Sequence, residues 1–366
     1  MIKNVLIIGG YGGVGKNLVE LLAEEGLHNI FIGGRNREKG EALRNKLLKK
    51  YPQANIQFKE VDACSARSLH AAMDGINLAV VTATVPDYME EIARVAIQQK
   101  VDLMDILVRE DIAGQLRKYE QEAKEDGRIF ITQGGFHPGM ILPMMKVACS
   151  EIEEPKEAYV YMAMAPVFDN AESLKEIFYE VNRTKPLLLS EGMWIKAKYT
   201  DTPSMEFSSD FGKKACYPLN MPEIYGIDKE LGLKNAGTYV AGFHWFIDYV
   251  VFTLAVILGK ISVNLSQNVC SWIFYHFSKT LKEKIPKVEM IAIAKGEKDN
   301  PQTSKIIIKS DDGYLLTAQA VYALIIQYIR GSIQMPGIHL MGQIMDEKEL
   351  MEVLSELKVT IQYQKN

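Results

Sequence analysis

The feature that most constrains this chain is a glycine-rich turn between a short apolar run and an amphipathic stretch. The run is Val5–Ile8, the turn is Gly10-Tyr11-Gly12-Gly13-Val14-Gly15, and residues 14–25 carry apolar side chains three and four positions apart. This order is typical of a strand, a tight turn and a helix. In the G-x-G-x-x-G spacing, the first glycine allows the turn, Gly12 lets a ligand approach the backbone, and Gly15 lets the helix pack closely on the strand. The segment therefore predicts a phosphate-binding turn at a helix N-terminus.

The same alternation continues to residue 132 and predicts a parallel sheet covered by helices on both faces. We expect helices at about 14–25, 37–50, 65–73, 87–99 and 111–126. The expected strands are Val5–Ile8, Ile30–Gly33, Ile56–Val61, Leu78–Thr82, Val101–Asp105 and Ile129–Thr132. The prediction is a doubly wound α/β domain over residues 1–150 that binds a dinucleotide. Its turn residues Gly10, Gly12, Gly13, Val14 and Gly15 are assigned to the cofactor.

The end of the second expected strand decides which dinucleotide is favoured. An NAD enzyme usually places a carboxylate there against the ribose 2′-hydroxyl. This chain has Arg35-Asn36-Arg37 instead, and a guanidinium group suits a 2′-phosphate. We therefore assign Arg35 and Asn36 to the cofactor and favour NADP, with NAD as the alternative. The competing interpretation is that Arg35 and Arg37 only begin a solvated helix.

Two further strand ends carry residues suited to a cofactor, because binding in such sheets occurs at the carboxyl ends of the strands. Asp62-Ala63 ends the third strand, where the carboxylate either accepts a hydrogen bond from an adenine amino group or caps the next helix. Thr82-Ala83 ends the fourth strand, and these small residues let a ribose or diphosphate pass close to the backbone.

The first 150 residues resemble the saccharopine dehydrogenase-like family of NAD(P)-dependent oxidoreductases. The resemblance rests on Gly9–Gly15, Gly34-Arg35-Asn36 with Lys39, Val61-Asp62-Ala63 and Gly135-Phe136-His137-Pro138-Gly139-Met140, with a weaker similarity from Phe211 to Glu223. It implies hydride transfer between nicotinamide and an imine or related unsaturated group of a small molecule. The alternative classes are a dinucleotide-binding sensor or scaffold without turnover, and a membrane-peripheral reductase of a lipid-like substrate.

His137 and Tyr88 are the candidate catalytic residues. His137 stands where amino-acid dehydrogenases of the family typically have an aspartate, so saccharopine itself is disfavoured as substrate. A histidine there can exchange protons near neutral pH, or it can brace the turn at Pro138-Gly139. Tyr88 follows Pro86-Asp87 at a helix start, where it either reaches the nicotinamide or packs. Asp105 ends the fifth strand and is either a further candidate or a cap.

The alternation breaks near Glu151, and the second half predicts an α+β domain with a mainly antiparallel sheet. Expected strands are Ala158–Ala165, Met193–Tyr199, Val288–Lys295 and Ser304–Lys309, with a hairpin turn at 296–301. We assign residues 151–335 to a substrate and oligomerisation domain. In the closing segment 336–366 we expect a helix at Asp346–Leu357 and a strand at Val359–Tyr363, packing back on the body of the protein.

One segment of the second half is unusually apolar. Between residues 236 and 278 only Asp248 and Lys260 are charged, and Tyr249–Gly259 is an unbroken apolar run. The run is about half the length of a membrane-spanning helix. It therefore predicts either a buried helix at a core or dimer interface, or a surface that contacts a membrane or a lipid-like substrate.

The composition excludes several other classes. The net charge of -4 disfavours general nucleic-acid binding. The four cysteines and six histidines lack the paired spacing of a zinc or redox site, so we expect no metal. No signal peptide is recognisable at the N-terminus, and we expect a cytoplasmic homodimer that binds a small-molecule substrate.

Overall fold

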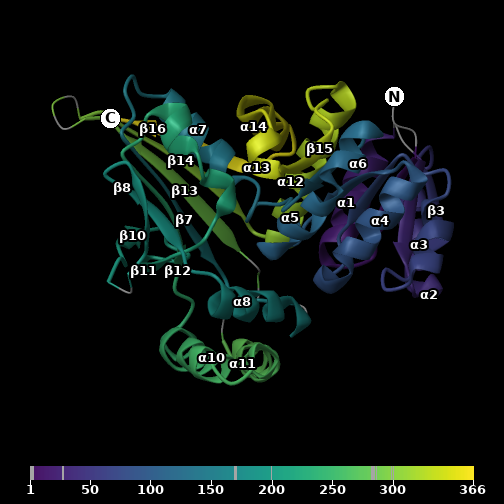
Figure 1. Cartoon of the computed structure of the whole chain (residues 1–366), viewed down its shortest axis with the longest axis horizontal. Coiled ribbons are helices and arrows are strands. Elements are labelled where there is room, and N and C mark those ends of the chain that lie inside the picture. The colour runs from purple at the N-terminus through teal and green to yellow at the C-terminus, as the bar shows by residue number, and fades with distance from the viewer. Residues whose placement is uncertain are drawn as a thin grey trace. The chain divides into compact units, whose positions relative to one another are not determined.

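The computed structural model describes residues 4–26, 29–168, 171–198, 200–281, 285, 287–297, 299 and 301–366. The chain divides into two compact units, the first comprising residues 1–140 and 314–354 and the second residues 141–313 and 355–366 (Figure 1). These boundaries differ from those expected at 150 and 335. The helix α7 (Ile141–Ser150) lies in the second unit, whereas nearly all of α12 (Gly313–Arg330) lies in the first.

The first unit alternates strands and helices as the sequence predicts. Its strands are β1 (Asn4–Ile8), β2 (Asn29–Gly34), β3 (Asn55–Glu60), β4 (Leu78–Val81), β5 (Asp102–Asp105), β6 (Ile129–Thr132) and β15 (Gly337–Leu340). Its helices are α1 (Gly13–Glu25), α2 (Arg37–Lys50), α3 (Ala66–Met73), η1 (Pro86–Tyr88), α4 (Met89–Gln99), α5 (Asp111–Leu116), η2 (Arg117–Tyr119), α6 (Glu120–Glu125), α12, α13 (Met341–Ile344) and α14 (Glu347–Glu356).

All seven strands of this sheet are parallel, in the order β15-β6-β5-β4-β1-β2-β3. The doubly wound prediction is therefore confirmed, and the structure adds a seventh strand. Strand β15 comes from the closing segment and pairs with β6, with Gly337 opposite Ile129. The expected C-terminal helix corresponds to α14, whereas the expected last strand corresponds to β16 (Thr360–Lys365) and joins the sheet of the second unit.

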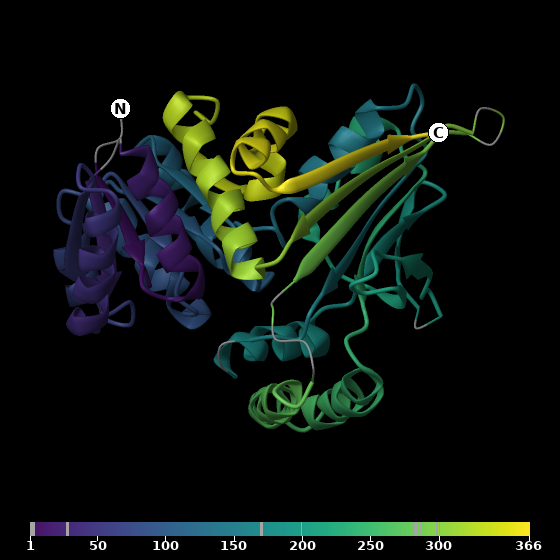
Figure 2. The same ribbon diagram turned by 180° about the vertical axis from the view of Figure 1, so that it is seen from behind.

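Helices cover both faces of the first sheet. On one face, residues of α3 and α4 such as Leu69 and Ile92 form a continuous core with Leu6 and Val81 of the strands. On the other face α1 and α12 lie side by side (Figure 2), and the Tyr322 hydroxyl of α12 donates a hydrogen bond to Glu25 of α1 at 3.0 Å. These contacts explain why α12 belongs to the first unit although it follows the second in sequence.

The second unit is built on a sheet with the path β10-β11-β12-β7-β13-β14-β16, to which β8 and β9 add at β12. Only the pair β12–β7 is parallel among the described ladders, so the mainly antiparallel prediction is confirmed. Its strands are β7 (Glu157–Met164), β8 (Leu187–Ser190), β9 (Met193–Lys196), β10 (Ser204–Glu206), β11 (Lys213–Pro218), β12 (Asn235–Ala241), β13 (Val288–Lys295), β14 (Thr303–Ser310) and β16. The expected strand Met193–Tyr199 ends at Lys196, and Tyr199 lies outside the described residues, as do Lys298 and Asn300 of the expected turn at 296–301.

The helices of the second unit include a hairpin formed by the apolar segment. They are α7, α8 (Glu172–Arg183), η3 (Pro222–Ile224), α9 (Ile227–Leu231), the π-helix η4 (Phe246–Val251), α10 (Phe252–Gly259) and α11 (Val263–Ser278). Helices α10 and α11 are antiparallel neighbours and pack on α8 (Figures 1 and 2). Their shared core contains Phe178, Val251 and Phe274. Over the part of the chain that the structure describes, no helix combines the length and apolar character needed to cross a bilayer.

Candidate functional site

The glycine turn leaves the first turn of α1 open. Gly12 is the N-cap residue in an extended conformation, and no side chain caps the helix. The Gly12 N–H donates to the Gly9 carbonyl at 2.8 Å, which closes the turn. No acidic side chain stands in the first turn of α1, whose residues Gly13 and Val14 begin the helix. The backbone N–H groups of this turn and the positive end of the helix dipole are therefore available to an anion.

The positions of Gly15 and Gly9 show why this turn needs glycine. A Cβ atom on Gly15 would lie 2.3 Å from the Gly9 carbonyl oxygen and 2.8 Å from Thr82 Oγ1, and a Cβ on Gly9 would lie 2.8 Å from the Ala83 amide nitrogen. Gly9 also has φ +89°, in the region that favours glycine. The structure thus brings Thr82 and Ala83 against the glycine turn. Gly10 is equally enclosed, because its Cβ would lie 2.9 Å from the Ile7 carbonyl oxygen.

The side chain of Tyr11 links the turn to the end of β2. Its hydroxyl accepts a hydrogen bond from the Asn36 backbone N–H at 2.9 Å, and its ring occupies the space that a side chain at Gly34 would need. Asn36 in turn caps α2, because its side chain accepts from the Lys39 N–H at 2.9 Å. The predicted residues Arg35 and Asn36 therefore lie at the same edge of the sheet as the glycine turn.

The two arginines at this strand end have different surroundings. Arg37 lies 3.8 Å from Glu60 and 5.4 Å from the centre of the Phe58 ring. Arg35 is exposed, and within the described part of the chain its guanidinium group makes no ion pair or ring contact. Arg35 is consequently the cation that a 2′-phosphate could engage without breaking an existing contact.

Asp62 does not cap the helix that follows it. That cap is Ser65, whose side-chain oxygen accepts from the Ser68 N–H. Asp62 Oδ1 instead accepts from the Cys64 N–H at 3.1 Å, which fixes the carboxylate in the loop after β3. Ala63 beside it is buried in the core under α3 and α4. The second oxygen of Asp62 has no hydrogen-bond partner among the described residues.

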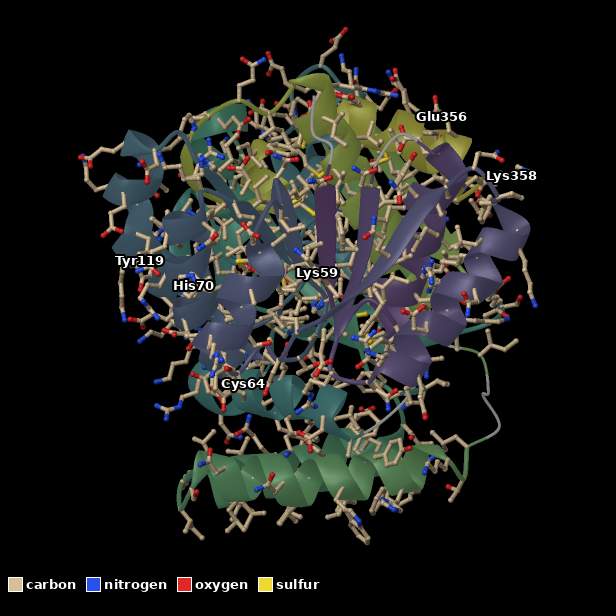
Figure 3. All side chains as sticks on the ribbon, turned by 90° about the vertical axis from the view of Figure 1, so that its right-hand side faces the viewer. Lys59, Cys64, His70, Tyr119, Glu356 and Lys358 are labelled. Carbon is tan, nitrogen blue, oxygen red and sulfur yellow. The ribbon has the colours of Figure 1, made fainter. Side chains whose placement is uncertain are left out.

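Tyr88 lies with the residues that follow β3. Its hydroxyl lies close to the thiol of Cys64, and this thiol, together with desolvation and the negative charges of Asp87 and Asp62, raises the pKa of Tyr88. Cys64 is exposed (Figure 3), as is Tyr88 itself. Tyr88 is the last residue of η1, which follows β4, so it lies on the side of the sheet where the carboxyl ends of the strands meet. A contact between Tyr88 and a nicotinamide ring stays a prediction.

Several buried polar groups gather at the carboxyl ends of β5 and β6. Asp105 Oδ1 accepts from the N–H groups of Leu107 at 3.0 Å and Gln133 at 3.4 Å. Thr132 lies beside this carboxyl group, but neither Asp105 Oδ2 nor Thr132 Oγ1 makes a hydrogen bond of ordinary geometry. Gln133 Oε1 and His137 Nε2 are also buried without a partner among the described residues. Such groups are costly unless a ligand or water satisfies them, so this cluster is a candidate polar subsite.

Burial shifts both titratable groups of the cluster towards their neutral forms. It raises the pKa of Asp105 to about 6, against the smaller opposing effect of its hydrogen bonds. It lowers the pKa of His137 to about 4. The imidazole is therefore neutral near pH 7 and can exchange a hydrogen bond at Nε2, whereas only a small fraction of it carries a second proton to donate.

Thr132, Gln133 and Arg109 are not among the residues predicted from the sequence. Thr132 is the last residue of β6 and Gln133 follows it directly, so the strand-end rule that selected Asp62 and Thr82 would have found them. Gln133 has φ +60° and donates through Nε2 to the Arg109 carbonyl at 3.5 Å. The Arg109 side chain binds Asp111 through two hydrogen bonds of 2.6 and 2.9 Å and Asp87 at 2.5 Å. It thereby holds the start of η1 against α5, which no local sequence pattern predicts.

The described residues contain no group of three or more histidine, cysteine or carboxylate side chains placed to hold a metal ion. The candidate site therefore consists of the open helix N-terminus, the strand-end residues Arg35, Asp62, Thr82 and Ala83, and the polar cluster at β5 and β6. Because the strands are parallel, these groups share one edge of the first sheet.

Comparison with known proteins shows what the chain is similar to. Residues 5–131 match the family model described as the saccharopine dehydrogenase NADP binding domain. Over its whole length the chain superposes on the apo saccharopine dehydrogenase (L-Glu forming) of Saccharomyces cerevisiae, with a TM-score of 0.71, 12% identity and 100% coverage of both chains. That likeness concerns the fold. A short chain dehydrogenase, sol3, of Alternaria solani is 25% identical over 107 residues, which are 28% of this chain and 38% of that relative's length.

Proposed function

We propose that this chain, whose residues 5–131 match the saccharopine dehydrogenase NADP binding domain, is an NADP-dependent oxidoreductase. The finer proposal is hydride transfer to or from an imine or a related unsaturated group of a small molecule. The observation that carries it is the open N-terminus of α1 beside the unpaired Arg35, with a cluster of unsatisfied polar groups at the same sheet edge.

The residues present fit NADP. The first-turn N–H groups of α1 would hold the diphosphate, and the enclosed glycines let it approach the backbone. Arg35 would meet the 2′-phosphate with a charge-assisted contact. The free oxygen of Asp62 would accept from the adenine amino group. Thr82 and Ala83 are small residues against the glycine turn, so they would leave room for the cofactor close to the backbone.

The polar cluster would serve the redox end of the site. NADPH supplies a hydride when it is bound, and the protein must orient the acceptor and manage one proton. Thr132 Oγ1, Gln133 Oε1 and His137 Nε2 provide hydrogen bonds for orientation. Asp105, with its pKa near 6, keeps an appreciable protonated fraction near neutral pH and is the carboxyl group best suited to hold that proton. In this proposal His137 orients and Asp105 holds the proton.

The first test of the proposal is cofactor binding measured by isothermal titration calorimetry. We expect NADPH to bind the full chain more tightly than NADH and to raise its melting temperature. A chain that binds neither nucleotide would refute the assignment at its first step. If NADPH binds more tightly than NADH, the proposed NADP site is supported, and the reaction is then tested separately.

The second test is turnover. NADPH oxidation should be followed with a panel of 2-oxo acids in the presence of amino acids or amines, which supply imines in equilibrium. Thr132→Val keeps the β-branched shape and removes Oγ1, so it should lower kcat while NADPH binding is retained. If wild-type protein binds NADPH but oxidises it with no member of the panel, the imine assignment is wrong and a dinucleotide-binding sensor is favoured.

A further inference from the structure

The helical hairpin of the second unit exposes an unusual amount of apolar surface. We call the segment from Trp245 to Lys279 the hairpin; it contains η4, α10, α11 and their connections. The most exposed side chains are Ile261 at 75%, Trp245 at 64% and Trp272 at 59%. Tyr249, Val250, Val256, Ile257 and Leu265 are also exposed. Exposed apolar side chains are ordinary when scattered singly, whereas a contiguous group marks a contact surface.

Packing within the second unit does not account for this surface. Helix α10 has the sequence Phe-Thr-Leu-Ala-Val-Ile-Leu-Gly and is apolar around almost its whole circumference, but Ala255 is its only fully buried residue. The inner side of the hairpin is already satisfied, because Val251, Cys270 and Phe274 pack on Leu174 and Phe178 of α8. A helix that is apolar on all sides normally lies in a core or in lipid. The outward side of α10 therefore has room for a partner.

The charges around the hairpin indicate the chemistry of that partner. Between residues 236 and 281 the sequence contains one carboxylate, Asp248, and two lysines, Lys260 and Lys279. Asp248 is partly buried and accepts a hydrogen bond from the Phe243 N–H at 3.0 Å. Both lysines are exposed. The exposed charges of the hairpin are thus positive, although the whole chain has a net charge of -4.

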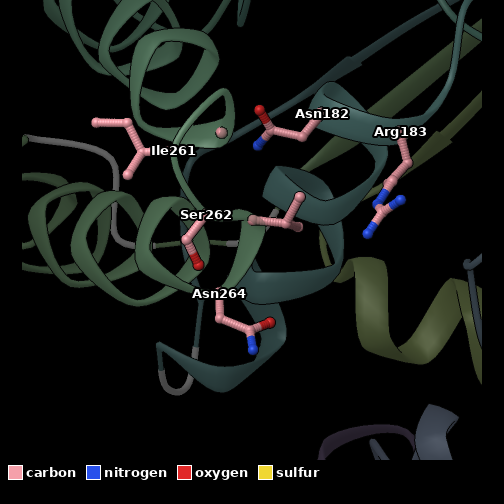
Figure 4. Close-up of a pocket in the computed structure, with 7 residues that line it drawn as sticks. Asn182, Arg183, Ile261, Ser262 and Asn264 are labelled. Atoms are coloured by element: carbon pink, nitrogen blue, oxygen red, sulfur yellow. The ribbon is translucent and has the colours of Figure 1, made fainter.

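A further cation lies beside the turn between α10 and α11. Arg183, at the end of α8, is exposed and lines a shallow hollow of about 500 Å³ together with Asn182, Ile261, Ser262 and Asn264 (Figure 4). The fit of α8 to this turn is close, because a Cβ on Gly259 would lie 1.8 Å from Asn182 Oδ1. Arg183 and Lys260 therefore flank the most exposed apolar residue of the hairpin, Ile261.

We propose that the hairpin is a membrane-docking element that lies on a bilayer carrying anionic phospholipids. Tryptophan and tyrosine beside aliphatic residues suit the bilayer interface, where an apolar ring meets a polar surface. The flanking cations complement anionic headgroups. With helices of 8 and 16 residues, the hairpin is too short to span and lies in the plane of the interface. This inference rests on the second unit and does not depend on the proposed function.

The charge pattern favours a bilayer over a second copy of the chain. A two-fold interface sets the same patch against itself. Two hairpins would bring Lys260 and Lys279 of both copies to one interface, and residues 236–281 offer no exposed carboxylate to pair with them; like charges across an interface are unfavourable. An anionic bilayer satisfies the apolar side chains and the cations at once. An anionic bilayer is therefore the partner that fits the hairpin best.

The test is flotation of the full chain with vesicles of phosphatidylcholine alone and of phosphatidylcholine mixed with phosphatidylglycerol. We expect binding to the mixed vesicles that weakens as salt is added. The variant Ile257→Glu/Ile261→Glu changes two exposed side chains and should lower the partition by about tenfold or more. Met193→Glu alters a side chain that is 66% exposed in β9 and should bind as wild type does.

Lys260→Ala should weaken binding only to the anionic vesicles. Failure of the wild-type chain to bind either vesicle would overturn the proposal, as would equal binding to both. Light scattering covers the remaining alternative. If the wild type is a dimer that Ile257→Glu/Ile261→Glu dissociates and that does not float with vesicles, a second copy covers the hairpin and the proposal is wrong.

Discussion

The Tyr11 hydroxyl accepts the backbone N–H of Asn36 at 2.9 Å and so joins the glycine turn to the end of β2. The tyrosine ring lies over Gly34, where an added Cβ would approach the ring to within 2.4 Å. The segment that would hold the diphosphate and the segment that would hold the 2′-phosphate are therefore fixed to each other by one side chain. Arg35 stands in the chain between Gly34 and Asn36, both of which contact Tyr11. Its backbone position is therefore fixed by these two contacts.

Removing the Tyr11 hydroxyl should weaken NADPH binding with little change in stability. Tyr11→Phe keeps the ring over Gly34 and loses one hydrogen bond at an exposed position, worth roughly 1 kcal/mol or less. Because the start of α2 is then less constrained, we expect the Kd for NADPH to rise by roughly three- to tenfold, measured by calorimetry. Tyr51→Phe is a matched control, since its hydroxyl contacts Glu24 at 3.3 Å away from this edge. An equal effect in both variants would contradict the assigned role.

Arg35 should determine the preference for NADPH. Contacts of a guanidinium with a phosphate contribute about 1.5–3 kcal/mol, so Arg35→Ala should raise the Kd for NADPH by roughly 10- to 100-fold and leave that for NADH nearly unchanged. Arg37→Ala should have a smaller effect, because Arg37 is engaged with Glu60 and Phe58. Titrations of both variants with both nucleotides decide the question. Loss of NADPH preference in Arg37→Ala alone would transfer the role to Arg37.

Gly15→Ala should both destabilise the first unit and abolish cofactor binding. Its Cβ would lie 2.3 Å from a backbone oxygen, so α1 must move away from the turn. Overpacking of this kind costs about 1–3 kcal/mol, which a lowered melting temperature would show. Gly114→Ala is the control, because it lies within α5 with no atom within 4 Å of its Cβ. Alanine there should be neutral or stabilising by about 0.5–1 kcal/mol. A drop in melting temperature for Gly114→Ala would undermine the comparison.

The regular half of the fold follows from the sequence, and the exceptions have physical causes. Strands β1 to β6 are short buried runs separated by amphipathic helices, and each is visible as a local pattern. Strand β15 is not, because its partner β6 lies about two hundred residues earlier and its four residues have no alternation to distinguish them. In the same way β12 enters the middle of the second sheet, but Asn235–Ala241 contains two alanines and a glycine and has low strand propensity.

The candidate site likewise contains residues that the sequence predicts and residues that it does not. The glycine turn, Arg35, Asp62 and Thr82 were found because their roles depend on residue type at a strand end. The position of Tyr88 beside Cys64 depends on two loops that follow different strands, so this proximity could not be predicted from local sequence patterns. The cluster of Asp105, Thr132, Gln133 and His137 is similar. Asp105 and His137 were predicted as candidates, whereas Thr132 and Gln133 were passed over although they stand at a strand end. Burial, which is a tertiary property, is what makes the unpaired polar atoms of all four residues unusual.

Asp105 and His137 should have opposite effects on how stability depends on pH. The pKa of Asp105 is raised from 3.8 to about 6, so its contribution is fully present below the lower value and is lost as pH rises through about 6. The pKa of His137 is lowered from 6.5 to about 4, so its contribution is present above the higher value and is lost as pH falls through about 4. As pH rises from about 4 to about 6 in the wild type, titration of Asp105 lowers the stability and titration of His137 raises it, so the two effects oppose each other.

Single substitutions should reveal the pH dependence that each group contributes. Asp105→Asn removes the titration of Asp105, so the melting temperature should increase more steeply as pH rises from about 4 to about 6 than it does in the wild type. In His137→Gln it should instead decrease over that range. Each contribution is at most about 3–3.5 kcal/mol, since each pKa differs from its ordinary value by about two to two and a half. Asp228→Asn, in α9 of the second unit, is a control for loss of a carboxylate charge, because an amide oxygen can still accept the hydrogen bond that Trp194 Nε1 donates to Asp228 Oδ1 at 3.1 Å. Parallel pH profiles for all variants would show that neither group is buried as the structure places it.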